Sequence, residues 1–403
     1  MAQARRGGQI QSKLGFLIYG NKGTWKSSLA AQLGDMITEK GQRMNVLYID
    51  TENGSVDDLL NQKASEGIDV SNIYVVYTTS FEEVVDFVKQ AKIANTKTPI
   101  VNRYIDDDGK MVNEPLTNED GSYFIPDAIV IDSLSVLYDS LVQATTQFSQ
   151  KRAGVRANRN GLVGAEKAVA VEGAGMEIKD YQTLDFRGKE LILDLMASGK
   201  NFVVTAREKA IKKSVKGDNG QIQMIDTGEV CPQGFKQVDY NVKTVLHTEV
   251  DEDGTVIAIV EDKDRTGVKS QGEVIKNPSL LDWQDVITKN INRQEFLVKN
   301  SLEEDIKKEV DSQAQKIVDT VGGGIIDKSD FDTDLEALKG DMKDIITKLR
   351  ANKDKTIMSK LSKLYEDNGI KEKNPDNYKD IASLQKVKDM VLDWISKNNI
   401  AID

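Results

Sequence analysis

Cysteine and histidine are almost missing from this chain, which has one of each, Cys231 and His247, among its 403 residues. A disulfide within the chain is therefore impossible, and a zinc site built from cysteine and histidine would lack ligands. A catalytic triad or a Cys–His pair would have to use His247, whose strand-like surroundings, residues 242–248, favour a structural role. The scarcity of cysteine fits a reducing compartment, and we expect a cytoplasmic protein.

Long hydrophobic runs are missing as well. No stretch reaches the roughly 18 apolar residues that a membrane-spanning helix needs. The N-terminal residues, with Arg5 and Arg6, lack the apolar core of a signal peptide. We therefore expect no membrane partner. The net charge of −11 argues against nucleic-acid binding by the surface as a whole, so any such binding must come from local basic patches.

Short apolar runs alternate with helical patterns over the first half of the chain. The runs are residues 14–19, 45–50, 73–77, 128–132 and 201–205. Leu29, Leu33 and Met36 lie on one face of the first helical pattern, and residues 81–94 form the second. This alternation predicts an α/β fold with a parallel sheet covered on both faces.

Three further strand-like runs follow at residues 221–226, 242–248 and 255–261. The last two are joined by the turn signal of residues 251–254, which predicts an antiparallel edge to the sheet. Residues 98–123 are polar and rich in turn signals, and we expect an inserted hairpin or surface excursion. Its acids at 106–108 favour a solvated turn, with metal binding as the alternative.

We expect an α/β core over residues 1–283, a helical linker over 284–330 with a glycine-rich hinge at 321–324, and a small helical domain over 331–403. The helical domain is predicted from apolar residues at helical spacing. These are Leu335, Leu338, Met342, Ile345, Ile346 and Leu349, then Leu361 and Leu364, then Leu384, Val387, Val391 and Trp394.

The first run leads into a motif of the kind that cradles phosphate. The motif and the residue after it read Gly20, Asn21, Lys22, Gly23, Thr24, Trp25, Lys26, Ser27, Ser28. In a phosphate-binding loop, backbone N–H groups surround the phosphates, the lysine reaches the β- and γ-phosphates, and the Ser or Thr hydroxyl binds Mg²⁺. Trp25 stands where the pattern has its second glycine. It fits only if its backbone angles stay allowed and its ring points outward.

Two acids follow later strands. Asp132 ends the buried run 128–132, as in a Walker B strand whose acid holds the water shell of Mg²⁺. Glu52 lies just past the run 45–50 and is predicted to act as the general base toward the attacking water. An ordinary acid at a strand end, capping a turn, is the alternative for Glu52.

Basic residues gather at three places. Lys263 and Arg265, after the hairpin, are predicted to stabilise charge on a γ-phosphate, within the chain or across a subunit interface. Two segments that we expect to be loops are candidates for DNA binding through phosphate contacts. The first contains Lys151, Arg152, Arg156 and Arg159, and the second contains Lys209, Lys212, Lys213 and Lys216. Neither has an aromatic residue for base stacking, and solvated flexible loops are the alternative.

Along the chain, the phosphate loop is followed by the strand before Glu52, the strand that ends in Asp132, the two basic segments, and the hairpin before Lys263 and Arg265. In this order, these elements resemble the RecA superfamily over roughly residues 14–270. They are most similar to the compact RecA-like ATPases of bacteriophages that act with single-strand annealing and recombination systems. The resemblance implies an oligomeric ring or filament that binds ATP, Mg²⁺ and single-stranded DNA, in the host cytoplasm if a phage encodes it. It implies that Lys26 and Ser27 bind phosphate and metal, Asp132 is the Walker B acid and Glu52 the catalytic glutamate.

The same resemblance extends to three other segments. Residues 263–267 are similar to the Lys-Asn-Arg-Phe-Gly motif of RadA-type proteins, which reaches a neighbouring subunit's nucleotide. The two basic segments lie where RecA-like proteins place DNA-binding loops, and residues 204–209 resemble the strand end that senses nucleotide. Trp25, the insertion at 98–123 and the approximate match at 263–265 are departures from the family pattern.

Other functions remain open from the sequence. A hexameric helicase-type motor would use the same core, and a scaffold that binds nucleotide without hydrolysis would explain Trp25. A small-molecule kinase is the weakest alternative, because no arginine-rich lid is visible. The C-terminal helices are expected to bind a recombination or replication partner, or a neighbouring subunit.

Overall fold

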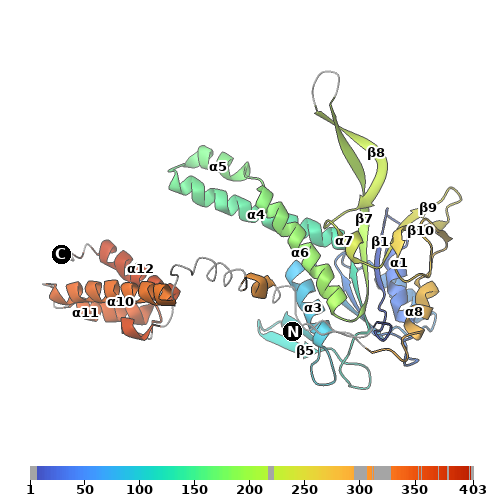
Figure 1. Ribbon diagram of the computed structural model, residues 1–403, viewed down its shortest axis with the longest axis horizontal. Coiled ribbons are helices and arrows are strands. Elements are labelled where there is room, and N and C mark those ends of the chain that lie inside the picture. The colour runs from blue at the N-terminus through green and yellow to red at the C-terminus, as the bar shows by residue number, and fades with distance from the viewer. Residues whose placement is uncertain are drawn as a thin grey trace. The chain divides into compact units, whose positions relative to one another are not determined.

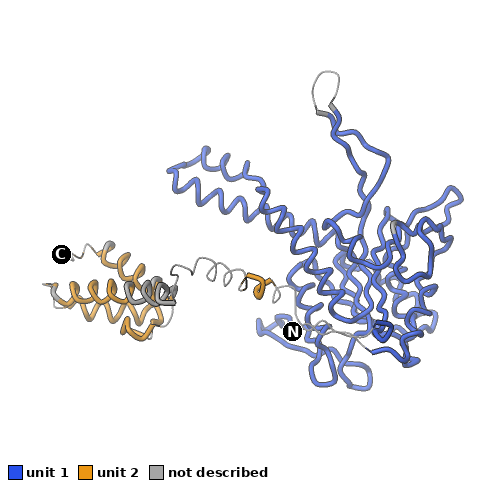
Figure 2. The backbone as a smooth tube through the Cα atoms, viewed as in Figure 1, with its two compact units in different colours: residues 1–305 blue, residues 306–403 orange. Residues whose placement is uncertain are grey.

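The computed structural model describes residues 7–216, 222–294, 306–310, 312, 328–352, 354, 356–370, 372–378, 381–398 and 400. The chain forms two compact units, residues 1–305 and 306–403 (Figure 2). Val286 and Ile287 are buried in the core of the first unit, so this core continues past residue 283, where the sequence predicted its end. The predicted hinge at 321–324 lies outside the described residues.

A mostly parallel sheet forms the centre of the first unit (Figure 1). Its strands lie in the order β11-β10-β9-β1-β7-β6-β2-β3, with β8 (Ile222–Pro232) paired to β7. The parallel strands are β1 (Gly15–Gly20), β2 (Val46–Asp50), β3 (Ile73–Tyr77), β6 (Ala128–Asp132), β7 (Asn201–Lys216) and β9 (Thr244–Val250). The antiparallel edge consists of β10 (Val256–Asp264) and β11 (Val274–Lys276). Both the parallel sheet and its antiparallel edge confirm the prediction.

Helices cover both faces of this sheet, which explains why β1, β2 and β6 are buried along their whole length. One face packs against α1 (Lys26–Ala31), η1 (Gln32–Asp35), α2 (Asp57–Ser65), η2 (Leu280–Trp283) and α8 (Gln284–Thr288). The other packs against α3 (Phe81–Ile93), α4 (Leu134–Arg159), α6 (Ile178–Ala197) and α7 (Val238–Asn241). Leu29, Leu33 and Met36 are all buried, but Met36 lies past the end of η1 in extended backbone.

The predicted insertion is a separate two-stranded antiparallel sheet of β4 (Val101–Ile105) and β5 (Met111–Pro115). At its turn, the Asp106 carboxylate accepts hydrogen bonds from the backbone of Asp108 and Lys110, at 3.1 and 2.8 Å. Within the described residues no three metal-binding side chains gather into a site. The acids at 106–108 therefore form a turn.

Two projections leave the sheet (Figure 1). The first is a helical arm of α4 and α5 (Gly164–Glu172), and the second is a long hairpin of β7 and β8 (Ile222–Pro232). Lys151, Arg152, Arg156 and Arg159 lie on α4, and Lys209, Lys212, Lys213 and Lys216 lie on β7. The prediction that both basic segments are loops is wrong, since each belongs to a regular element. Gln221, the first residue of the predicted strand 221–226, lies outside the described residues.

The second unit contains α10 (Lys328–Ala351), α11 (Ile357–Asp367), η4 (Pro375–Asn377) and α12 (Ile381–Lys397), besides the helical residues 306–310. Its core contains Leu338, Met342, Ile346, Leu349, Leu361, Leu384, Val387 and Val391, which confirms the predicted helical spacing. None of the helices in the described ranges is long and apolar enough to cross a membrane.

Candidate functional site

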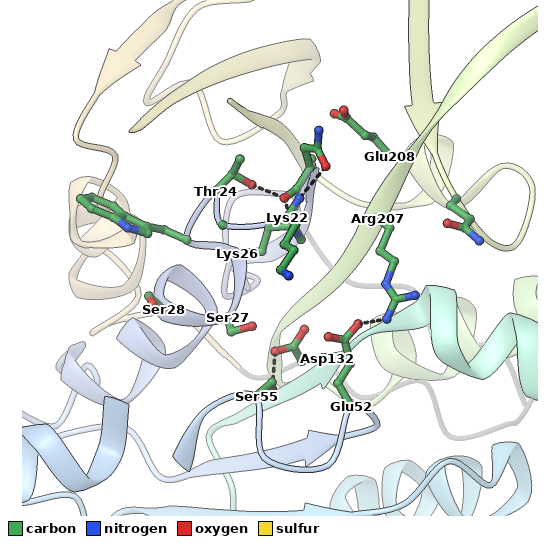
Figure 3. A pocket seen from close by; sticks show the side chains of 15 residues that line it. Lys22, Thr24, Lys26, Ser27, Ser28, Glu52, Ser55, Asp132, Arg207 and Glu208 are labelled. Carbon is green, nitrogen blue, oxygen red and sulfur yellow. Dashed lines mark hydrogen bonds and ion pairs between the residues drawn. The ribbon is translucent and has the colours of Figure 1, made fainter. Parts of the chain in front are cut away.

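A cavity of about 700 Å³ opens at the edge of the sheet where the parallel strands β1, β2 and β6 end (Figure 3). It is lined by Gly20, Asn21, Lys22, Gly23, Thr24, Trp25, Lys26, Ser27, Ser28, Glu52, Ser55, Asp132, Arg207, Glu208 and Gln233. The structure thus brings together the whole predicted phosphate loop and the two predicted acids. The lining residues come from five separate parts of the chain.

Backbone and hydroxyl contacts shape the loop. Gly20 is required by space, since a Cβ there would lie 2.1 Å from the carbonyl oxygen of Thr248 on β9. The Asn21 carbonyl accepts hydrogen bonds from Thr24 Oγ1 at 2.9 Å and from Lys26 Nζ at 2.6 Å. Thr24 Oγ1 also lies 2.8 Å from Thr248 Oγ1. The loop is therefore held from inside by its own side chains and from outside by β9.

Trp25 meets both conditions that the sequence set for it. Its backbone has φ 62° and ψ 18°, the left-handed region that glycine adopts freely, and its side chain is 49% exposed. Its carbonyl accepts the hydrogen bond from Leu29 N at 2.8 Å and so begins α1. A bulky residue in this conformation costs about 1–2 kcal/mol, which the surrounding contacts must offset.

Asp132 is buried at the end of β6 and is fixed by hydroxyl groups. Its Oδ2 accepts hydrogen bonds from Tyr48 at 2.6 Å and Ser55 at 2.9 Å, and its Oδ1 accepts one from Thr205. Burial, and then the Asp132 carboxylate, raise the pKa of Tyr48 well above its usual value. Tyr48 therefore stays protonated and remains a donor to Asp132.

Two acids near the end of β2 have separate tasks. The buried Asp50 carboxylate accepts hydrogen bonds from the backbone N–H groups of Glu52, Gly54 and Ser55, each at 2.8 Å. Asp50 therefore builds the turn that the alternative reading gave to Glu52. Glu52 itself lines the cavity, where Oε1 accepts hydrogen bonds from Ser133 Oγ at 2.9 Å and from Arg207 at 3.0 Å.

Charges of both signs meet at the cavity. Burial lowers the pKa of Lys26, and Asp132, Glu52 and Glu208 oppose this change by raising it. The cations are thus Lys26 and Arg207, with Lys22 on the loop, and they face three carboxylates. Such an arrangement suits an anionic ligand that brings a divalent cation with it.

Lys263 and Arg265 do not line the cavity. In the pairing of β9 with β10, Thr248 at the loop edge is opposite Ala258, whereas Asp264 is opposite Thr244 at the other end of the strand. Lys263 and Arg265 therefore lie toward the other ends of these strands, away from the cavity. There, Lys263 Nζ and Arg265 donate to the Tyr240 carbonyl at 3.0 and 3.4 Å.

The basic residues of the two projections differ in their surroundings. On α4, Arg152 forms an ion pair with Asp180 at 2.5 Å and Arg156 one with Glu177 at 3.0 Å, which ties the arm to the start of α6. Lys151 and Arg159 are exposed. On β7, Lys209, Lys212 and Lys213 are exposed, and the side chain of Lys216 is outside the described residues.

Four lining residues were not among the predicted site residues: Ser55, Arg207, Glu208 and Gln233. Arg207 and Glu208 lie in the segment that the family resemblance singled out, so that segment was the available signal. Ser55 and Gln233 carry no such signal, since the Asp50 turn and the β7–β8 pairing bring them there. Neither a protein-family model nor a curated protein sequence matches this chain, so function must be inferred from the cavity.

Proposed function

We propose that this chain is a Mg²⁺-dependent ATPase with a RecA-like core that acts on single-stranded DNA in recombination, repair or replication. One observation carries the proposal. The phosphate-loop residues, Glu52, Asp132 and Arg207 line one cavity at the end of a parallel sheet, which is where α/β folds bind their ligands.

The phosphate loop supplies the binding site for the nucleotide. Its backbone N–H groups and the Lys26 ammonium provide donors and positive charge for the phosphates. Lys26 already lies within the loop, bound to the Asn21 carbonyl. A γ-phosphate would compete for that ammonium with better charge complementarity.

The donor set fits Mg²⁺. The cavity offers the Ser27 hydroxyl and the Asp132 carboxylate, which are oxygen ligands of the kind that this ion prefers. Three hydroxyl groups hold the Asp132 carboxylate in one orientation. In this orientation, the carboxylate is suited to accept hydrogen bonds from water bound to the ion. Bound Mg²⁺ would neutralise charge on the phosphate oxygens.

Hydrolysis would depend mainly on positioning and electrostatics. Glu52 is the residue suited to orient water and accept its proton. Arg207 is suited to stabilise charge on the γ-phosphate. The ion pair between the two residues holds Glu52 at the cavity wall.

The DNA-binding part of the proposal is supported by the two projections. They carry exposed cations on an otherwise acidic chain, which would localise phosphate contacts to the arm and the hairpin. Lys263 and Arg265, at the ends of the strands away from the cavity, would act on the cavity of a neighbouring subunit in a ring or filament. The DNA contacts and this action on a neighbouring subunit are proposals, as is partner binding by the second unit.

The decisive experiment measures ATP hydrolysis with Mg²⁺, with and without single-stranded DNA. Glu52→Gln should lower kcat by about 100-fold or more while nucleotide binding remains. Lys26→Ala should weaken binding itself. The control Glu66→Gln makes the same chemical change at an exposed position at the end of α2 and should behave as wild type. Absence of Mg-ATP binding would end the proposal. Hydrolysis that is indifferent to DNA at every salt concentration would remove its DNA part.

DNA contact is tested separately by anisotropy of a labelled single strand. Replacing Lys209, Lys212 and Lys213 together by alanine should weaken binding and reduce the slope of log K against log salt by about 2, or about 0.7 per lost contact. Replacing Lys40, Lys97 and Lys110, which are exposed elsewhere on the unit, changes the net charge equally and serves as control. Equal effects of both triple variants would mean that only overall charge matters.

A further inference from the structure

Trp25 differs from the other two tryptophans of the chain in its surroundings. Trp283 is fully buried in the core of the first unit, and Trp394 packs against the core of the second. The Trp25 side chain is half-exposed and lines the candidate cavity. Among the described residues, no aromatic ring stacks on its indole and no cation lies over it. The indole is therefore accessible to a ligand in the cavity.

Neither the backbone nor the core explains a tryptophan at position 25. The left-handed backbone of this residue suits glycine and is strained for a bulky side chain. The half-exposed ring contributes little to packing. Strained residues of this kind gather at ligand sites, where the surrounding structure holds them in place. Contact with a ligand is therefore the role that remains for the ring.

Strand order determines which end of a ligand meets Trp25. In the sheet, β1 lies between β9 and β7. Glu52, which follows β2, and Arg207 of β7 come from one side of β1. Thr24, next to Trp25, contacts Thr248 of β9 on the other side, and Figure 3 shows Thr24 and Arg207 apart across the cavity. A ligand whose terminal phosphate lies at Glu52 and Arg207 therefore extends its other end toward Trp25.

The cavity has room for more than phosphates. Its volume of about 700 Å³ falls within the roughly 300–1,000 Å³ of sites that hold a whole small-molecule ligand. Among the described residues that line it, Trp25 is the only one with an aromatic side chain, and the others are polar, charged or glycine. Every nucleobase has a π-face that stacks on an exposed aromatic ring. A base in this cavity can stack on no other lining side chain.

We propose that Trp25 binds the nucleobase of the nucleotide by stacking, while the rest of the loop holds the phosphates. This inference rests on the proposed function, because it assumes that a nucleotide enters the cavity. It makes Trp25 a specificity-determining residue, which selects nucleotides over polyphosphates that carry no base. Glycine at this position has no side chain that could do so.

The test compares Kd for Mg-ADP with Kd for Mg-pyrophosphate, which has two phosphates but no base. Calorimetry is done on full-length wild type, Trp25→Gly, Trp25→Leu and Trp25→Phe. The glycine and leucine variants should bind Mg-ADP about tenfold more weakly or worse, while Kd for Mg-pyrophosphate stays unchanged. Trp25→Phe keeps an aromatic face and should lose less. Trp25→Leu keeps a large apolar side chain on the same backbone, so it separates stacking from bulk.

Tryptophan fluorescence reports the contact directly. Mg-ADP should quench the emission of wild type, because the base lies against the Trp25 indole, and Mg-pyrophosphate should not. Trp25→Phe should bind Mg-ADP without this quench. Trp394→Phe makes the same chemical change in the second unit, and should keep both the quench and the affinity of wild type.

Three results would overturn the inference alone. The first is an unchanged Kd for Mg-ADP in Trp25→Gly and Trp25→Leu. The second is an equal loss of affinity for both ligands, which would mean that Trp25 acts only through the shape of the loop. The third is a Trp25→Phe variant that binds Mg-ADP as weakly as Trp25→Leu. If neither Mg-ADP nor Mg-pyrophosphate binds to wild type, the proposed function fails together with the inference.

Discussion

The guanidinium of Arg207 lies 3.0 Å from the carboxylate of Glu52, although 155 positions separate the two residues along the chain. The Arg207 backbone is fixed in turn, because its N–H donates to Ser135 Oγ at 2.8 Å and its carbonyl accepts from Gln233 N at 2.7 Å. Ser133 holds Glu52 from the other side. The orientation of the proposed general base therefore depends on Arg207 of β7 and on Ser133, which follows β6.

Arg207→Ala is expected to lower kcat for ATP hydrolysis by at least about tenfold, because it removes both the orientation of Glu52 and a positive charge at the cavity. Arg207→Lys keeps the charge but not the planar fork, so its rate should be intermediate. Steady-state ATPase measurements give kcat, and Kd for Mg-ADP should change less. A kcat like that of wild type would show that Glu52 needs no help from Arg207.

Gly20→Ala should destabilise the first unit by about 1–3 kcal/mol, because the added methyl group overlaps the Thr248 carbonyl. Gly23→Ala is the matched comparison. Its φ of +80° disfavours alanine, but space around it is open, so it should cost about 1 kcal/mol. Urea unfolding measures both. Equal losses would mean that backbone conformation, and not contact with β9, dictates glycine at position 20.

Trp25→Gly and Trp25→Ala remove the same exposed ring, but only glycine adopts the left-handed conformation freely. We expect the glycine variant to be more stable than the alanine variant by up to about 1 kcal/mol. Unfolding is followed by fluorescence of the buried Trp283 in a Trp394→Phe background, so that the first unit alone is reported. An alanine variant at least as stable as the glycine variant would contradict the assigned backbone conformation.

Arg152→Ala should lower the thermal stability of the first unit in a pH-dependent way. The hydrogen bond from Arg152, followed by that from the Glu177 backbone, lowers the pKa of Asp180 to about 2. The unfolded value is about 3.9. The unfolded state thus binds more protons between these values, and the stabilisation is complete above about pH 4 and is lost as the pH falls through about 2.

The loss of melting temperature caused by Arg152→Ala should therefore be larger at about pH 5 than at about pH 3. Lys151→Ala removes a neighbouring exposed cation of the same helix and is the control. It should change melting temperature little at either pH. A difference between Arg152→Ala and wild type that stays constant from pH 5 to pH 3 would exclude the ion pair as its cause.

The strands β1, β2 and β6 were predictable because each is apolar along most of its length and buried on both faces. The basic segments were not, for a physical reason. Beyond residue 205, both faces of β7 carry charged residues, and pairing with β8 makes this segment a strand. The outer half of α4 buries few residues, and its contacts with α6 through Arg152 and Arg156 fix its position. In both cases the structure depends on a distant partner that local periodicity does not show.

The same dependence on a distant partner explains the cavity. Glu52 and Asp132 could be placed from the strands that they follow, but Glu208 and Gln233 reach the cavity only through β7 and β8. The role of Asp50 was also hidden, since an acid at a strand end looks the same whether it faces a ligand or three backbone N–H groups.

The contact of Thr248 with the phosphate loop has a consequence for synthesis of the protein. The loop lies near the start of the chain, yet Thr248 closes it by contacting Gly20 and Thr24. A ribosome must therefore add more than two hundred further residues before the loop can take its final form. A nascent chain, or a fragment that ends before β9, carries the full motif but lacks the residue that shapes it.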